Sequence, residues 1–407
     1  MNDPVRSDRI APLWRNGDFL LLWGGQTVTA LGGGISSLSL PLLALAITHS
    51  PAQAGFVGAL RLLLYVALTL PAGALVDRWD RKRVMVLCNA GLGLGVGSIP
   101  LALALGRLTV AQLYVNSAVA GMCSTFLYAA ERAALPRIVS PAQLPAAMAR
   151  NEATESVVTL LSPSLGGILY GAGRALPFAA DAVSYTVAAL SLLRIRREFQ
   201  GERSRAPRAL RVEIREGFAW LWRQPLLRAM GLLQAGYFFV FGFGGSDLLV
   251  IVLARRHGAA PAAIGLIFAA GGAGGLLGAL VAPWVRRRAG VGRVVIGVHW
   301  LFALLWPLYA LAPSPLALGL VEAAVAFVDQ IHDVAWVSHR TARIPDTLQG
   351  RVGGVNRLLQ LCLRPFGLAL GGVLIARAGA PTTILLAACG LVALAIATTA
   401  NGAIRAA

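Results

Sequence analysis

The sequence carries little charge and almost no lysine. Of its 407 residues only 13% are charged while 57% are hydrophobic, and 18 acidic residues stand against 36 basic ones. Such a composition leaves too little polar surface for an ordinary soluble domain. The single lysine, Lys82, is followed by Arg83. The phosphate-binding pattern G-x-x-x-x-G-K-[ST] therefore cannot form, which argues against a nucleotide-driven pump.

Cysteine and histidine are also scarce, with four and five residues respectively. The cysteines all fall in apolar stretches, without the spacing of a disulfide framework or of paired zinc ligands. His332 and His339 share one helical face, but two histidines do not complete a zinc ligand set. No nucleophile and base are paired elsewhere. We therefore expect no metal, no cofactor and no enzymatic site.

Long apolar stretches dominate the chain. Each is near the roughly 20 residues that a helix needs to cross a bilayer. We predict twelve membrane-spanning helices and an all-α fold, with spans at about 18–47, 52–76, 84–104, 109–131, 151–172, 175–193, 229–254, 260–283, 294–312, 315–338, 352–376 and 380–400. The amino-terminal 17 residues are largely polar, so we expect an uncleaved first span rather than a signal peptide.

Two motifs recur at one offset. Gly-Ala-Leu-Val followed by three basic residues occurs from Gly73 and again from Gly278, an offset of 205 residues. Asn151 followed by Gly166-Gly167 returns at the same offset as Asn356 followed by Gly371-Gly372. The chain therefore reads as two copies of a six-helix unit, related by a pseudo-two-fold axis along the membrane normal, as in transporters built from repeats. We expect halves at 1–194 and 228–407, joined by a linker at 195–227.

Basic residues mark one side of the predicted membrane protein. Of 36 lysines and arginines, 28 lie in the amino-terminal segment, in the loops after even-numbered spans and after the last span, and 5 in the opposite loops. Cytoplasmic loops are enriched in these residues, so both termini should be cytoplasmic. The net charge of +18 then reflects the enrichment of basic residues in cytoplasmic loops, and we expect no nucleic-acid partner. Within the linker, Leu210, Phe218 and Trp222 recur at helical spacing, which predicts an amphipathic helix along the inner membrane surface.

The loop after the second span carries the most specific motif. Gly73, Leu75, Asp77, Arg78, Arg81 and Lys82, followed by Arg83, resemble the signature G-x-L-x-D-R-x-x-R-[KR] of the major facilitator superfamily. A small residue such as Gly73 allows close helix approach, and the basic residues anchor the loop at the interface. The resemblance implies that Asp77 faces the start of the eleventh span, near 350–356, as a latch that closes the cytoplasmic side. The second copy has Ala282 and Pro283 in place of the Asp-Arg pair, so the latch should be asymmetric.

The fifth span contains a second motif of the superfamily. Ser162-Pro163-Ser-Leu-Gly166-Gly167 resembles the G-P-x-x-G-G part of the antiporter motif of exporters, with serine at the first glycine. Pro163 should bend the helix, and the glycines should permit tight packing against a neighbour. The intramembrane arginine that many drug/proton antiporters carry in the fourth span is missing, since 109–130 holds no charge.

The order of segments resembles one exporter group within the superfamily, which includes bacterial macrolide-efflux proteins and siderophore exporters of the enterobactin type. This resemblance covers nearly the whole chain. It is carried by Ala130–Pro136 after the fourth span, Asp181–Ser184 in the sixth, Arg223–Arg228 before the seventh, and Gly350-Arg351 to Asn356-Arg357 entering the eleventh.

The tenth span carries the candidate chemistry. Glu322, Asp329 and Asp333 lie 7 and 4 residues apart and so share one helical face. Ionisable residues in a membrane helix are costly unless they face water, a partner or a substrate. Candidate counter-charges are Arg357 and Arg364 in the eleventh span and Arg61 in the second. One or more of the carboxylates would bind a proton or a cationic substrate, with Asp329 as the best candidate. The alternative is a static salt-bridge network.

Asp247 in the seventh span is a candidate gate residue. It follows Gly242, Gly244 and Gly245, where a helix can loosen; ordinary close packing is the alternative. Together these features predict a monomeric secondary transporter of the bacterial cytoplasmic membrane, with lipid, a small-molecule substrate and protons as partners. We expect export of small drug-like or siderophore-like amphipathic molecules by alternating access. An uptake carrier, a uniporter and a non-transporting membrane scaffold remain alternatives.

Overall fold

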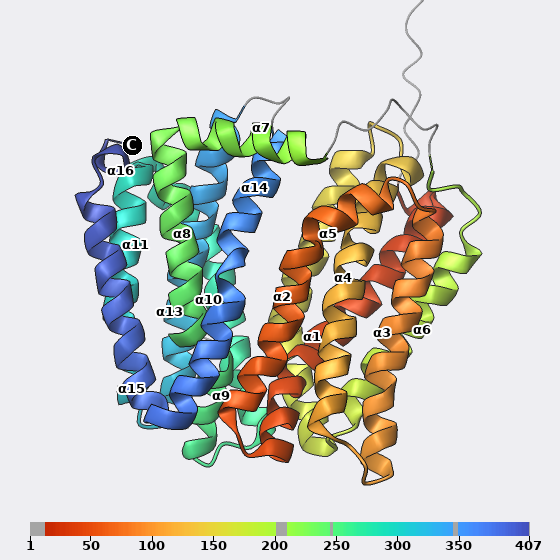
Figure 1. The fold of residues 1–407 in the computed structure, drawn as a ribbon, viewed down its shortest axis with the longest axis horizontal. Helices are drawn as coiled ribbons and strands as arrows, with labels where there is room; N and C mark the ends of the chain where they lie inside the picture. Colours follow the sequence, from red (N-terminus) through yellow and green to blue (C-terminus); the bar gives the residue numbers. More distant parts are fainter. Residues whose placement is uncertain (1–12, 201–209, 245–246, 345–348, 407) are drawn as a thin grey trace, which may run out of the picture.

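The computed structural model describes residues 13–200, 210–244, 247–344 and 349–406, all of them in helices or short connections (Figure 1). One bundle contains α1 (Gly17–Thr48), α2 (Pro51–Val76), α3 (Arg81–Ala104), α4 (Val110–Ile138), α5 (Leu144–Ala172) and α6 (Leu176–Arg194), preceded by the short helix η1 (Leu13–Arg15). The other contains α8 (Pro225–Gly244), α9 (Asp247–Arg256), α10 (Pro261–Ala289), α11 (Val291–Leu305), α12 (Leu308–Leu311), α13 (Pro315–Arg343), α14 (Gln349–Cys362), α15 (Arg364–Ala400) and α16 (Gly402–Arg405). Between them lies α7 (Leu210–Arg223).

Local sequence explains several helix boundaries. Ser50 and Ser314 each accept a hydrogen bond from the third backbone N–H of the helix that follows, and each is followed by proline at the first helical position. Both choices are typical of helix starts. Gly379, inside α15, has φ of 82° and is followed closely by Pro381, so the helix kinks there. This kink separates the eleventh and twelfth predicted spans.

Ten helical stretches of the described residues are long and apolar enough to cross a membrane by length and composition. One of them, 352–400, contains the Gly379 kink and so provides two spans. The 29-residue helix α5, which is more polar, lies in the first bundle and accounts for the remaining predicted span. The all-α polytopic fold is therefore confirmed.

Several boundaries differ from the prediction. The fourth span ends at Ile138 instead of 131, and the tenth continues to Arg343 instead of 338. Both helices continue past charged side chains, because backbone hydrogen bonds maintain a helix whether or not every side chain is apolar. The seventh predicted span falls on α8 and α9, and 245–246 between these helices lie outside the described residues.

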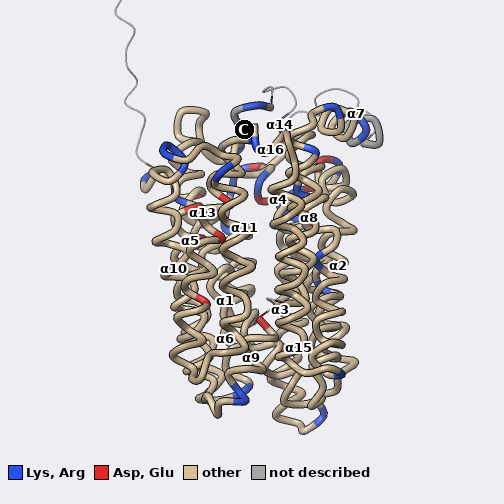
Figure 2. Tube along the Cα trace, turned by 90° about the vertical axis from the view of Figure 1, so that its left-hand side faces the viewer, with Lys and Arg blue, Asp and Glu red and all other residues tan. Residues whose placement is uncertain are grey.

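The two ends of the molecule differ in charge. We call the end where α7 and the C-terminus lie the α7 end, and the opposite end the α9 end (Figure 1). Lysine and arginine gather at the α7 end, with fewer at the α9 end (Figure 2). Helix α7 lies across the α7 end and contacts α8 and α14 (Figure 1). Its Leu221 is buried against Leu227 and Val352.

The glycine pairs repeated at an offset of 205 residues occupy equivalent packing positions. A Cβ at Gly166 would lie 2.8 Å from the Ile35 carbonyl oxygen of α1, and one at Gly371 would lie 2.7 Å from Cα of Phe243 in α8. The second glycine of each pair instead packs across to the other bundle, Gly167 onto Gly265 of α10 and Gly372 onto Gly55 of α2. The tight packing predicted for this part of α5 is present, and the duplication is therefore structural as well as sequential.

Close contacts between the bundles are concentrated toward the α9 end. There α2 packs on α15 through Gly55 and Gly372, and α5 packs on α10 through Gly167 and Gly265. The α5–α10 contact continues to Gly272, where a Cβ would lie 3.1 Å from Cα of Leu160. Toward the α7 end α14 and α2 diverge (Figure 1), and Gly353 and Gly354 of α14 have no atom within 4 Å of a built Cβ.

Candidate functional site

Two carboxylates of α13 are held by tyrosine hydroxyls. Tyr237 of α8 donates to Asp329 Oδ1 at 2.9 Å, and Tyr309 of α12 donates to Glu322 Oε2 at 2.5 Å. Both acids are half-buried. Among the described residues, neither has a lysine, arginine or histidine nitrogen within 4 Å. A static salt-bridge network, the alternative considered from the sequence, is therefore not formed at these two positions.

The Tyr237 side chain is fixed by aromatic packing. Its ring stacks on Phe302 of α11 with centroids 5.1 Å apart, and His332 of α13 lies edge-on at 5.9 Å. His332 in turn contacts His299, whose Nδ1 lies 2.8 Å from the Val295 carbonyl oxygen. Packing against α11 and α13 thus directs the hydroxyl of Tyr237 toward Asp329. In the part of the chain that the structure describes, no group of three histidines, cysteines or acids could hold a metal ion.

Arg364 supplies the nearest positive charge to this group. It begins α15, its Cζ lies 5.8 Å from the ring centroid of Phe238, and it interacts electrostatically with Asp329 and Asp247. Asp247 is exposed and is the first residue of α9. The helix end before it is held by Trp306, whose Nε1 donates to the Gly244 carbonyl oxygen at 3.1 Å. Residues 245–246, between Gly244 and Asp247, lie outside the described residues, so the loosening of the seventh span stays a prediction.

Asp333 belongs to a different environment from the other two acids. It is exposed and interacts electrostatically with Arg340 of its own helix and with Glu152 of α5 in the other bundle. Asp329 still interacts electrostatically with both Asp333 and Glu322, so the three carboxylates remain neighbours along α13. Glu322 faces Tyr309 and Asp329 faces Tyr237. Asp333 lies nearer the α7 end, between the bundles.

Arg61 does not join the α13 acids. It interacts electrostatically with Asp181 and Tyr185 of α6, inside the first bundle. Asp181 is fully buried, and a Cβ at Gly32 would lie 2.7 Å from its Oδ1. The glycine leaves the room that this carboxylate occupies. The network that the sequence suggested for Arg61 is therefore replaced by one within α1, α2 and α6.

A half-buried acid of the first bundle was missed as a site residue. Glu131 of α4 hydrogen-bonds Gln26 of α1 and interacts electrostatically with Tyr185. The predicted fourth span ended at 131, so this glutamate appeared to be terminal. The helix in fact continues to Ile138, which places Glu131 well inside it. The charged pair Glu131-Arg132 led us to end the predicted helix there. The apolar residues that follow this pair could have indicated that the helix continues.

Arg357 of α14 connects the two bundles. Its guanidinium donates to the hydroxyls of Tyr128 in α4 and Tyr65 in α2, both at 2.9 Å, and lies 4.9 Å from the Tyr128 ring centroid. Arg132 donates to the same Tyr128 hydroxyl at 2.7 Å. Two arginines therefore converge on one tyrosine between the bundles.

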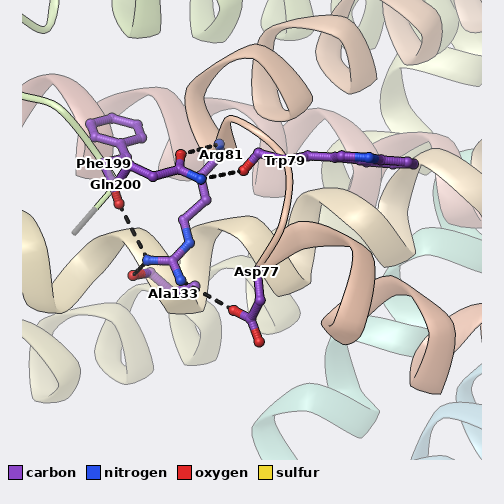
Figure 3. A network of polar contacts seen from close by, with 6 residues as sticks. All are labelled: Asp77, Trp79, Arg81, Ala133, Phe199 and Gln200. Carbon is purple, nitrogen blue, oxygen red and sulfur yellow. Dashed lines mark hydrogen bonds and ion pairs between the residues drawn. The ribbon is translucent and has the colours of Figure 1, made fainter. Parts of the chain in front are cut away.

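The signature loop holds the segment that leaves the first bundle (Figure 3). Arg81, 16% exposed, donates to the carbonyl oxygens of Ala133 and Phe199 at 3.1 and 3.2 Å and to Asp77 at 3.1 Å. Lys82 donates to the Ile195 carbonyl oxygen at 2.7 Å. Among the described residues, Arg83 forms an ion pair with Asp80, at 3.5 Å. Arg81 and Lys82 thus bind backbone oxygens of 195–199 instead of only anchoring the loop at the interface.

Other parts of the signature differ from the expectation. The Asp77 side chain is 70% exposed and forms an ion pair with Arg81, so the latch to α14 is not formed between described residues in this conformation. The expected partner segment, 350–356, belongs to α14, and residues 345–348 just before this helix lie outside the described residues. Gly73 has no atom within 4 Å of a built Cβ and makes no close helix approach here, whereas the equivalent Gly278 packs against Phe327 of α13. Arg78 helps to line a cavity at the α7 end.

The cavities found at the α7 end lie apart from these acids. One of them, about 580 Å³, lies beside the start of α1 and the end of α6 and is lined by Arg15, Asp18, Arg194, Arg196 and Arg197 among others. Arg197 in it pairs with Asp18 at 3.6 Å. None of its lining residues comes from α13. We therefore place the candidate site at the polar side chains between and beside the bundles, where the intramembrane charges lie.

Comparison with known proteins agrees with this geometry. The chain is 28% identical over 387 residues to the multidrug efflux pump Tap of Mycolicibacterium fortuitum, covering 91% of this chain and 92% of the relative. It is 24% identical over 367 residues to the enterobactin exporter EntS of Salmonella typhi, covering 90% and 86%. A bacterial homologue of the iron transporter ferroportin, solved in an inward-facing state, superposes with a TM-score of 0.75 at 15% identity and coverage of 95% and 98%.

A bacterial homologue of the human lysosomal transporter Spinster, inward-facing and unoccupied, superposes with a TM-score of 0.73 at 15% identity and coverage of 96% and 97%. At this identity the two structures establish the fold. The family model described as "Major Facilitator Superfamily" matches residues 22–363, most of the chain. The helical repeats, the signature loop and this match together establish that the protein is a multi-pass membrane transporter and a member of the major facilitator superfamily.

Proposed function

We propose that this protein is a secondary transporter that exports small amphipathic molecules, drug-like or siderophore-like, in exchange for protons. The observation that carries the proposal is Asp329: a half-buried carboxylate in a membrane helix, bound by a tyrosine hydroxyl and near Arg364, without an ion pair among the described residues. Such a group can take up and release a proton or meet a cation. The names of the efflux relatives support the outward direction.

The distribution of basic residues supports an orientation with the α7 end in the cytoplasm of a bacterial cell. Figure 2 displays this asymmetry, and the arginines of 194–197 and of the signature loop contribute to it. Both termini would then be cytoplasmic. A reporter that is active only outside the cytoplasm, fused after Ala407, should be inactive, and an active fusion would reverse the orientation.

In this orientation the bundles are closed on the outer side and apart on the inner side. We propose that the halves 1–194 and 228–407 rock about the α2–α15 and α5–α10 contacts, with 195–227 as their tether. When the inner side closes, Asp77 would leave solvent and meet the start of α14, whose N-terminal N–H groups attract a carboxylate. Asp247, at the start of α9, would move with the outer side.

The direction of transport is tested in everted membrane vesicles and in right-side-out cells that make the wild type or Asp329→Asn. Candidate drugs and siderophores are scanned for energy-dependent movement. Export predicts accumulation in everted vesicles and lowered cell content, both lost in the variant. Accumulation in cells would indicate uptake, downhill movement alone a uniporter, and absence of any movement a scaffold. Asp80→Asn, an exposed acid of the signature loop, is the matched control.

A further inference from the structure

The two arginines that converge on Tyr128 lack a negative partner. Within the described residues, no carboxylate oxygen lies within 4 Å of Arg132 or Arg357. The groups that interact with Arg357 are the two tyrosines, Tyr65 and Tyr128. Glu131, although next to Arg132 in sequence, is hydrogen-bonded to Gln26 of α1. The pair therefore presents positive charge that the described protein does not neutralise locally.

Membrane topology alone does not explain the positions of Arg132 and Arg357. Arg357 lies on α14, eight residues into the helix, and its tyrosine partners belong to α2 and α4 of the other bundle. Arginine inside a membrane protein is costly unless it has a partner or faces a water-filled path. Tyr128 is 38% exposed and Arg132 is exposed, so the group is accessible between the bundles.

The chemistry of the group fits an oxyanion. A guanidinium presents a planar set of N–H donors that match a carboxylate, and phenol hydroxyls can add further donors. The hydroxyls of Tyr65 and Tyr128 now accept from Arg357, which leaves their own hydrogens free to point toward a bound oxygen. Two adjacent guanidinium groups would repel a cationic group, and a neutral acceptor would gain less from them than an anion does.

We propose that Arg132 and Arg357, with the hydroxyls of Tyr65 and Tyr128, form an anion-binding subsite that receives an acidic group, such as a carboxylate, of the transported molecule. The inference deepens the proposed function, on which it rests. It adds that the substrates include molecules that carry an oxyanion at one end. Because the subsite includes residues of both bundles, an occupying anion would also bridge them.

The test uses a probe pair that differs in charge and little in shape, benzoate and benzamide. Their binding to the purified full chain is measured by ligand-observed NMR in phosphatidylcholine nanodiscs. The wild type should bind benzoate at least about tenfold more tightly than benzamide, the size expected for one charged hydrogen-bonded contact. Arg357→Gln should bring the ratio close to one. Arg357→Lys keeps the charge but loses the planar fork, and should give an intermediate ratio.

Arg107→Gln is the matched control, because it removes the same charge from an exposed residue between α3 and α4. It should keep the benzoate preference, and thermal unfolding should show that all variants are folded. Lack of a preference in the wild type, its retention in Arg357→Gln, or an equal loss in Arg107→Gln would overturn the proposal.

A second arm separates a substrate anion from a lipid headgroup, which shares the oxyanion chemistry. Replacement of part of the phosphatidylcholine by phosphatidylglycerol should leave benzoate affinity unchanged. If phosphatidylglycerol abolishes benzoate binding, the site belongs to lipid and the assignment to substrate is wrong. The experiment measures binding and not transport. A negative binding result therefore does not contradict export, and a negative export result does not change the interpretation of the binding data.

Discussion

The hydroxyl of Tyr237 on α8 donates a 2.9 Å hydrogen bond to Asp329 on α13, and the aromatic packing around Tyr237 fixes that donor. This contact ties Asp329 of α13 to α8, and the ring packing of Tyr237 extends the link to α11. We propose that the protein alternates between two states. Protonation or substrate binding at Asp329 would change this contact first.

Tyr237→Phe should weaken transport and stability together. It removes only the hydroxyl, so Asp329 loses its donor while the ring packing remains, and the free energy of unfolding should fall by about 1 kcal/mol. A double-mutant cycle with Asp329→Asn, followed by chemical unfolding in mild detergent, should give an interaction energy of at least about 0.5 kcal/mol. Strictly additive effects of the two substitutions would show that the contact is not formed.

Gly55→Leu should separate the bundles at the α9 end. A Cβ at Gly55 would lie 2.9 Å from Cα of Gly372, so a larger side chain must displace α15 and should cost about 1–3 kcal/mol. Gly58→Leu, one turn further along α2, has open space and is the matched control. Spin-label distances between the bundles at this end should increase only in Gly55→Leu. Equal distances in both variants would contradict the described contact.

Arg81→Gln should release the segment 195–200. The variant loses donors to two backbone carbonyl oxygens and to Asp77, so amide hydrogen exchange in 195–200 should become faster, by roughly tenfold if about 1.4 kcal/mol of local stability is lost. Arg83→Gln serves as control, because that side chain is 85% exposed and exposed pairs contribute little. Unchanged exchange in Arg81→Gln would mean that the segment is held by other contacts.

Asp77→Asn should slow transport with little effect on the stability of this conformation. The carboxylate is 70% exposed and, among the described residues, forms an ion pair with Arg81 alone, so its loss should change the unfolding free energy by less than about 1 kcal/mol. If Asp77 latches onto α14 when the inner side closes, transport should fall by several-fold. A normal transport rate, measured at saturating substrate, would remove the latch from the proposed cycle.

The fold was accessible from the sequence because its signals are local. Apolar runs indicate membrane spans, proline after a capping serine indicates a helix start, and the repeated glycines indicate close packing. The match to the superfamily confirms the fold that these signals predict together. Helix ends were less accessible: Glu131 looked terminal because charge follows it, while the structure places it inside α4.

The site was only partly accessible, because its partners are distant in sequence. The spacing of the α13 acids identified them as site candidates. Tyr237 lies 92 residues from Asp329, and no local sequence pattern predicts that these two residues are in contact. Arg61 was assigned to the wrong set of helices for the same reason, since charge alone does not say which neighbour is in reach. Arg357 and Tyr65, 292 residues apart, meet only because the two bundles pack together.

The most direct test of the account is proton flux in liposomes that contain the purified protein, with wild type beside Asp329→Asn and candidate drugs and siderophores as substrates. The account predicts that substrate drives proton movement in the wild type, and that the variant, although folded, loses it. Substrate movement without proton movement, unchanged in Asp329→Asn, would contradict exchange with protons and leave the Tyr237–Asp329 contact as a purely structural one.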